Sequence, residues 1–162
     1  MVETMHALVP VLAVVLAGLL AGLFFAFSIA VMPGLGRAGD RAMIEAMRGV
    51  NAAILNPWFA VVFVGAPVAV LAALVLHAGS GEAVAAAWSA SALVLLVAVY
   101  VITFGVNVPR NNALEQAGPA ERIGDPAAVR ADFEGVWVRW NHLRTLVSLA
   151  ALVCAAIAIA AH

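Results

Sequence analysis

The chain has 162 residues, of which 65% are hydrophobic and only 10% are charged, and its formal net charge is −1. This composition excludes a soluble globular domain and gives no reason to expect a nucleic-acid partner. The single cysteine, Cys154, excludes an internal disulfide and redox chemistry of the Cys-x-x-Cys kind. We therefore expect an integral membrane protein.

Four apolar segments are long enough to cross a membrane, which takes about 20 residues. They cover residues 7–32, 57–76, 83–106 and 143–161. The first segment lacks a basic region before it and is longer than the apolar core of a secretory signal, so we expect it to be retained. The predicted fold class is all-α, with residues 1–162 forming a single four-helix transmembrane bundle.

The connection between the first two spans is predicted to contain an additional helix. Proline and glycine in residues 32–36 are expected to stop the first span. Asp40 is a suitable N-cap, apolar residues then recur at helical spacing, and Arg41 and Glu45 are spaced for an ion pair. We interpret this segment as an amphipathic helix that shields the cytoplasmic face of the bundle.

The remaining boundaries follow from prolines and turns. Asn56-Pro57 opens the second span, and the short turn 77–82 makes spans two and three antiparallel neighbours. Pro109 is expected to kink or stop the third helix. A long helix-containing connection follows, in which Asp125-Pro126 begins a helix that runs on into the fourth span.

The placement of basic residues predicts the orientation in the membrane. All eight are arginines, and none lies at the termini or in the turn 77–82. By the positive-inside rule, both arginine-bearing connections are expected in the cytoplasm and both termini outside. The arginines of the first connection are Arg37, Arg41 and Arg48, and those of the second are Arg110, Arg122, Arg130, Arg139 and Arg144.

A polar and aromatic block, residues 137–144, runs directly into the fourth apolar span. Arg144 matters most, because an ionisable group at membrane depth usually faces the bundle interior or a watery cavity. At about 100° per residue, His142 points away from it. The same spacing places one broad stripe on the helix, made of Arg130, Phe133, Glu134, Trp137, Trp140, Asn141, Arg144 and Ser148.

The asparagines and tryptophans at this end each have two interpretations. The amides could bind an anionic or carbonyl-bearing ligand, or could satisfy free backbone groups near the prolines. Trp137 and Trp140 could stack on a flat ligand, or could belong to the aromatic belt of the membrane interface. The asparagines are Asn51, Asn56, Asn107, Asn111, Asn112 and Asn141.

Three histidines, His6, His77 and His162, fall on the outer side together with Glu3 and Glu82. A metal site there is geometrically conceivable, but no spacing such as His-x-x-x-His supports it. We therefore assign no metal ligands. We also identify no motif for a flavin, haem or nicotinamide cofactor.

Four motifs carry a resemblance that covers nearly the whole chain in order. They are Phe25 to Leu35 (FAFSIAVMPGL), Asn51 to Phe59 (NAAILNPWF), Asn107 to Leu114 (NVPRNNAL) and Trp137 to Arg144 (WVRWNHLR). Together they resemble the DUF1772, or anthrone oxygenase-like, family of small four-span membrane proteins. Its characterised fungal members oxidise anthrones to anthraquinones with molecular oxygen. The polar positions that the resemblance implies are Asn107, Pro109, Asn111, Trp137, Trp140, Asn141 and Arg144.

The resulting prediction is a membrane oxidoreductase that uses molecular oxygen on a lipophilic aromatic substrate at the cytoplasmic end. Catalytic residues would be Arg144, Asn141, Asn107 and Asn111, which stabilise an oxyanion. Substrate-binding residues would be Trp137, Trp140, Asn51 and Asn56. The alternative is a non-catalytic lipid-binding or accessory protein in which these residues are structural.

The expected partners are membrane lipids and a small lipophilic aromatic ligand. Gly18 and Gly22 form a Gly-x-x-x-Gly pattern in the first span, extended by Ala17 and Ala21. Such a surface allows close helix packing, either within the bundle or between the protomers of a homo-oligomer.

Overall fold

The computed structural model describes residues 2–162, with side chains described from Thr4 onward. Within this part of the chain the secondary structure consists of helices, without strands. Four continuous helical runs are long and apolar enough to cross a membrane: Thr4–Leu35, Pro57–Gly79, Ala83–Gln116 and Pro126–Ala160. The all-α fold class is confirmed.

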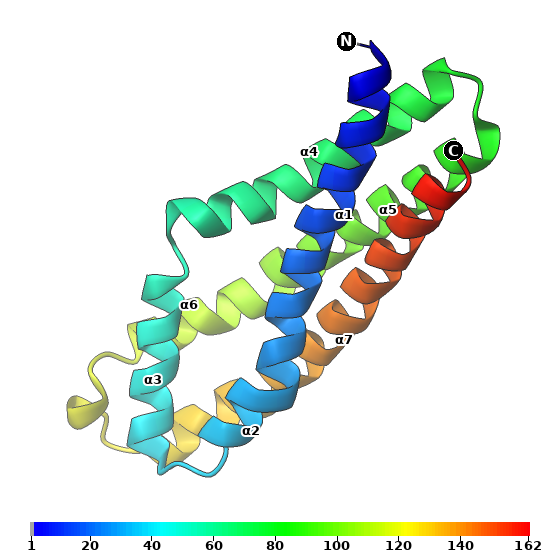
Figure 1. The fold of residues 1–162 in the computed structure, drawn as a ribbon. Coiled ribbons are helices and arrows are strands. Elements are labelled where there is room, and N and C mark those ends of the chain that lie inside the picture. The colour runs from blue at the N-terminus through cyan, green and yellow to red at the C-terminus, as the bar shows by residue number, and fades with distance from the viewer. Residues whose placement is uncertain (1) are drawn as a thin grey trace.

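The four long helices form a bundle in which each helix packs against two others (Figure 1). They are α1 (Val2–Ala26), α4 (Pro57–Gly79), α5 (Ala83–Ile102) and α7 (Pro126–Ala160). Helix α1 lies between α4 and α7, and α5 also lies between α4 and α7. Successive helices run in opposite directions, so the two termini lie at the same end of the bundle.

Two of the spans contain a π-helical turn just before a proline. Helix α1 continues through η1 (Phe27–Val31) into α2 (Met32–Leu35), which contains Pro33. Helix α5 continues through η2 (Thr103–Asn107) into α6 (Val108–Gln116), which contains Pro109. A proline lacks the N–H group and collides with the carbonyl group of the preceding turn, and a widened turn relieves both problems.

Of three predicted helix boundaries, one differs from the structure. Pro109 was expected to kink or stop the third helix, and it does not stop it, because the helical run continues through the π turn to Gln116. The stop predicted in residues 32–36 is confirmed, because the first run ends at Leu35, with Pro33 inside the helix. Helix α7 begins after Asp125, whose side chain accepts a hydrogen bond from the Ala128 N–H, and runs unbroken to Ala160 as predicted.

Helix α3 (Asp40–Ala53) and the short helix η3 (Ala120–Arg122) lie at the end of the bundle opposite the termini (Figure 1). Helix α3 packs across α6 and α7 through one apolar face. A bidentate ion pair between Arg48 and Glu115 ties α3 to α6, and this hydrogen bonding holds the pKa of the Arg48 guanidinium above its usual value. The buried cluster under α3 includes Met43, Ile44, Met47, Leu114, Phe133 and Trp137.

Two expected details of α3 are wrong. Asp40 was expected to be the N-cap, but Gly39 occupies that position. The Asp40 carboxylate instead forms an ion pair with Arg130 at 3.0 Å. Arg41 does not pair with Glu45 within the described residues, because its guanidinium donates to the backbone carbonyls of Ala120 and Ile123. Free carbonyl groups in a connecting loop are strong acceptors that sequence spacing on one helix cannot anticipate.

Arg130 fixes the chain between α2 and α3. Its guanidinium donates to the carbonyls of Gly36 and Ala38 at 3.0 and 2.8 Å and pairs with Asp40 and Glu134 at 3.0 and 2.6 Å. We expect Arg130→Gln to lower the free energy of unfolding by about 1–3 kcal/mol, because hydrogen bonds of charged groups are lost. Thermal unfolding in detergent measures this effect.

Arg139→Gln is the matched control, since Arg139 is an exposed arginine on the same helix. Its thermal midpoint should stay close to that of the unchanged protein. Equal midpoints for the two variants would contradict the role given to Arg130.

The small residues of α1 are used inside the bundle. Ala17 and Ala21 are buried, and a side chain at Gly18 would meet Leu152 of α7 at 3.7 Å. Gly22 has open space around it. Of the Gly-x-x-x-Gly pattern, Gly18 therefore packs against α7 whereas Gly22 is exposed, and pairing between protomers stays a prediction.

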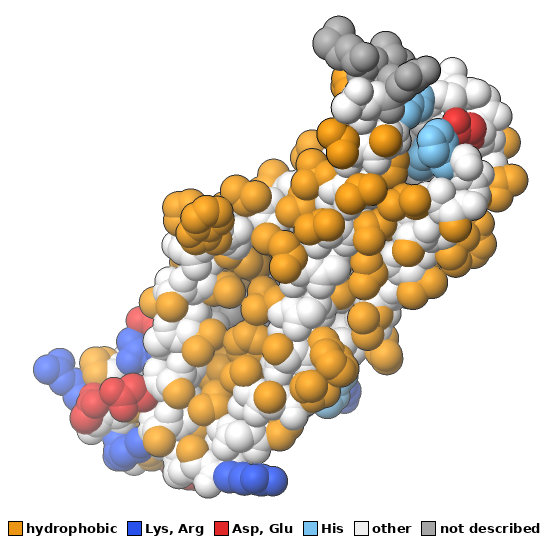
Figure 2. Space-filling view, viewed as in Figure 1, with side chains coloured by type: hydrophobic (Ala, Val, Ile, Leu, Met, Phe, Trp, Pro, Cys, Tyr) orange, Lys and Arg blue, Asp and Glu red, His pale blue; other side chains and the backbone are white. Residues whose placement is uncertain are grey.

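Large apolar side chains cover the outside of the bundle along its length, whereas the basic side chains gather at one end (Figure 2). Leu12, Val15, Val68, Val97 and Leu146 are all about half exposed or more. An apolar surface of this kind is stable only in contact with lipid, so the protein is an integral membrane protein. We name the end that carries α2, α3 and α6 the arginine end, and the end that carries the termini the histidine end.

Candidate functional site

Arg144 is the centre of a buried polar cluster near the arginine end. About 24 Å of helix separate it from Ala160, at 1.5 Å per residue, so it lies within the membrane-spanning part near its edge. Its side chain is 6% exposed. One guanidinium nitrogen donates to the Asn141 Oδ1 at 2.8 Å and another to the Thr103 Oγ1 at 3.3 Å.

Two aromatic rings cover the guanidinium group of Arg144. Its central carbon lies 4.4 Å from the ring centroid of Phe24 and 5.5 Å from that of Trp137. A helical side chain is tilted toward the N-terminus of its helix, which brings Arg144 toward Trp137 two turns earlier. The negative faces of the rings stabilise a cation that is withdrawn from water.

Arg144 differs from three arginines of the arginine end that are paired. Arg48, Arg110 and Arg130 each form an ion pair with a carboxylate. Within the described part of the chain Arg144 has no carboxylate partner, and its Nε atom has no hydrogen-bond partner. A buried cation without a counter-ion is costly, so an anion bound beside it would be strongly stabilised.

Asn141 connects α7 to the π turn of the first span. Its Nδ2 donates to the Phe24 carbonyl at 3.1 Å and to the Ser28 Oγ at 2.9 Å. The Ser28 hydroxyl also contacts the Thr145 Oγ1 at 2.9 Å. The amide therefore satisfies backbone next to η1 with one end and orients Arg144 with the other.

Asn107 and Asn111 hold Trp137 from the second π turn and the helix after it. The Asn107 Nδ2 donates to the Trp137 carbonyl at 3.2 Å, while its buried Oδ1 has no partner. The Trp137 indole N–H donates to the Asn111 Oδ1 at 2.7 Å. Phe133 stacks on Trp137 at 6.0 Å between centroids. Both π turns thus face α7 around the same cluster.

The structure brings together five of the predicted residues: Asn107, Asn111, Trp137, Asn141 and Arg144. The remaining three make no described contact with this cluster. Asn56 is an exposed N-cap of α4 that accepts from the Phe59 N–H at 3.0 Å. Trp140 is half-buried and has no described contact with the cluster, and Asn51 lies on α3 with its Nδ2 buried and unpartnered.

Four further residues belong to the cluster and were not predicted from the sequence: Phe24, Ser28, Thr103 and Thr145. Hydroxyl groups are sparse in the apolar spans, and Ser28 and Thr103 lie five and six residues before Pro33 and Pro109. That spacing is the signal that could have found them, since a proline in a span predicts freed backbone groups in the preceding turn.

A groove of about 300 Å³ opens between α6 and α7 beside the cluster. The ion pair between Arg110 and Asp132, at 2.9 Å, lies at its edge, and Phe133 forms part of its wall. Its size is at the lower end for a small-molecule site. The lining residues are Arg110, Ala113, Leu114, Ala117, Ala128, Val129, Asp132 and Phe133.

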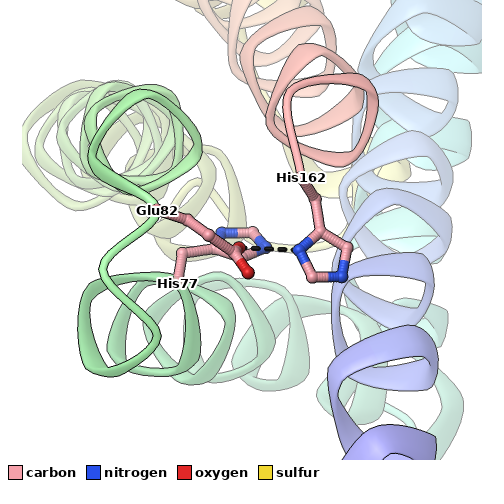
Figure 3. A group of neighbouring side chains, drawn as sticks. All are labelled: His77, Glu82 and His162. Atoms are coloured by element: carbon pink, nitrogen blue, oxygen red, sulfur yellow. Dashed lines mark hydrogen bonds and ion pairs between the residues drawn. The ribbon is translucent and has the colours of Figure 1, made fainter.

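A second group of polar side chains lies at the histidine end. The potential ligand atoms of His77, Glu82 and His162 are within 4.8 Å of one another (Figure 3). They come from α4, from the turn after it and from the end of α7. The structure thus brings together side chains that are too far apart in the sequence to form a recognisable motif.

A family model described as anthrone oxygenase matches residues 55–154. The matched region contains all of α4, α5 and α6 and most of α7, and so includes Asn107, Trp137, Asn141 and Arg144. It does not include α1 and η1, which supply Phe24 and Ser28. No curated protein and no solved structure gives a significant match to the chain.

Proposed function

Because the chain belongs to the anthrone oxygenase family, which indicates an oxygenase-type function in the membrane, we propose that it oxidises a flat lipophilic aromatic substrate with molecular oxygen at the arginine end. The observation that supports this most is the buried Arg144 guanidinium, which has neutral hydrogen-bond acceptors and no carboxylate partner among the described side chains. Such a group favours a substrate that becomes an anion during the reaction.

For an anthrone the chemistry balances with oxygen alone. The benzylic C–H loses a proton to give an enolate, which transfers one electron to oxygen. The carbon radical and superoxide then combine, a proton is taken up, and a hydroperoxide results. Loss of the second benzylic proton and cleavage of the O–O bond release water and leave the quinone. Overall, one anthrone and one oxygen molecule give one anthraquinone and one water.

The protein's contribution is to stabilise the anion and exclude bulk water. Arg144 would bind the enolate oxygen, and Asn141 would keep the guanidinium in place through its Oδ1. The unpartnered Oδ1 of Asn107 could accept a hydrogen bond from a phenolic hydroxyl. Since no carboxylate or imidazole contacts Arg144 in the described residues, the substrate proton would pass to water at the membrane interface.

The substrate would enter from the bilayer or the interface through the groove between α6 and α7. Phe133 borders this groove, stacks on Trp137 and is 2% exposed. A flat substrate would displace the Phe133 ring and stack on Trp137 in its place, since aromatic rings favour offset stacking. That exchange would bring the substrate oxygen to Arg144.

The direct test is oxidation of anthrone by the purified protein in lipid nanodiscs. We expect quinone formation, followed by absorbance, together with consumption of one oxygen molecule per quinone. Empty nanodiscs and heat-treated protein report the spontaneous oxidation. A rate no higher than these controls with anthrone and with hydroxylated anthrones would overturn the proposal.

A second candidate is a non-catalytic lipid-binding or accessory protein. Close packing favours it, because Arg144 is almost fully covered and does not line the groove between α6 and α7. In that case Asn141, Ser28 and Thr103 would only supply hydrogen-bond partners for backbone groups of the spans and for the buried guanidinium group. The nanodisc assay separates the candidates, since only the first predicts turnover.

We propose that the arginine end faces the cytoplasm, as the positive-inside rule predicts. A cysteine placed at Glu121, an exposed residue of η3, should react with a membrane-impermeant maleimide only after the cells are opened. A cysteine at Ser80, at the histidine end, should react in intact cells. Both variants carry Cys154→Ser so that only the new thiol is labelled, and the reverse pattern would contradict the orientation.

A further inference from the structure

His77, Glu82 and His162 form a compact group at the histidine end, remote from Arg144 (Figure 3). His77 lies on α4 and is fully buried, whereas Glu82 and His162 are 26% and 37% exposed. The His162 Nδ1 and the Glu82 Oε2 are 2.6 Å apart. Segments of the bundle that are otherwise separate therefore meet at one point.

Only one of the two ring nitrogens of His77 has a hydrogen-bond partner. Its Nδ1 is 3.0 Å from the Ser89 Oγ on α5. Its Nε2 is buried and has no hydrogen-bond partner. A histidine whose Nδ1 hydrogen is held by a neighbouring oxygen presents the lone pair of Nε2, which is the usual arrangement of a metal-binding histidine.

We infer that this group binds one divalent transition-metal ion, with zinc as the best fit. Two imidazoles and one carboxylate suit zinc, and they disfavour calcium and magnesium, which prefer oxygen ligands. The ligand atoms lie within 4.8 Å of one another, and Zn–ligand distances of about 2.0–2.2 Å require them to move somewhat closer. Glu82 and His162 lie at a turn and at a helix end, where small shifts cost little.

His6 and water are available for the remaining coordination position. The His6 ring stacks beside His162, with 6.3 Å between centroids, and its Nδ1 is 3.4 Å from the Ser80 Oγ. The ion would replace the hydrogen bond between His162 and Glu82 and release any proton held there. It would link α4, the turn between α4 and α5, and the end of α7, and so would stabilise the bundle at the end opposite Arg144.

The test uses full-length protein purified with an affinity tag that contains no histidines. After removal of metals with a chelator, zinc is titrated by isothermal calorimetry, and bound metal is counted by mass spectrometry after dialysis. We expect about one zinc per chain and a thermal midpoint that rises with zinc concentration, because binding to the folded state stabilises it. Absence of saturable zinc binding overturns the inference.

Glu82→Gln and His162→Ala should each weaken zinc binding at least about 10-fold. Both residues are partly exposed, so these variants should fold even if a change at the buried His77 does not. His142→Ala is the control, because His142 is an exposed histidine near the arginine end. Unchanged affinity in the two site variants, or an equal loss in the control, overturns the assignment.

Discussion

Arg144→Gln is expected to reduce the turnover number for anthrone oxidation at least about 100-fold, because removal of one preorganised partner of a developing oxyanion typically costs that much. Glutamine keeps hydrogen-bonding capacity near Asn141 and Thr103 but carries no charge. The loss should therefore appear in turnover more than in folding. Initial rates of quinone formation in nanodiscs, corrected for spontaneous oxidation, measure it.

Two further variants show whether the loss of turnover is specific to the guanidinium group of Arg144. Arg144→Lys keeps the positive charge but not the planar group between Phe24 and Trp137, so we expect activity between those of the unchanged protein and Arg144→Gln. Arg139→Gln removes an exposed charge from the same helix and should leave the rate unchanged. A folded Arg144→Gln protein with full activity would rule out the proposed mechanism.

The Arg144→Gln variant also tests the alternative in which the buried cluster has only a structural role. If the buried guanidinium only supported the bundle, Arg144→Gln would relieve an unpaired buried charge and could stabilise the protein. Loss of activity at an equal or higher thermal midpoint would thus separate catalysis from packing. Circular dichroism and size-exclusion chromatography show whether the helices and the oligomeric state are kept.

The four spans and the long final helix could be predicted because their signals are local. Apolar composition alone delimits the spans, and Asp125-Pro126 begins α7 as the sequence indicates. The π turns could not be predicted in the same way. A proline predicts a break in the helix. In the structure one turn before Pro33 and one turn before Pro109 are widened instead, and the helix continues. Whether a helix continues in this way depends on its packing against α7, which a local sequence signal does not contain.

The same difference between local and non-local signals decides which residues of the site could be predicted. Trp137, Asn141 and Arg144 share one helix, so helical spacing correctly places them on one face. Their partners Phe24, Ser28 and Thr103 come from other helices, whose rotation about their axes is set by side-chain packing and not by a short motif. Trp140 lies at the edge of the predicted stripe. It is rotated by about 60° from Trp137 and about 40° from Arg144 around the helix axis, and a rotation of this size decides whether a residue faces the cluster.

Asn141 is the position at which we expect the largest loss of stability. Its side chain is 1% exposed and connects Arg144 to Phe24 and Ser28 through three hydrogen bonds. Asn141→Leu keeps a similar volume but leaves the guanidinium and the Phe24 carbonyl without these partners. The expected cost is about 3–5 kcal/mol, because removing one partner of a buried charged group leaves the other uncompensated.

The loss is measured as the change in the midpoint of thermal or denaturant unfolding in detergent. Thr103→Val removes one longer acceptor contact of Arg144 and the local hydrogen bond from the Thr103 hydroxyl to the Val99 carbonyl, and should cost only about 1 kcal/mol. Asn112→Leu changes an exposed asparagine at the same end and should have little effect. If Asn141→Leu were no more destabilising than Asn112→Leu, the amide would not hold the first span to α7, and the buried cluster would owe its geometry to apolar packing alone.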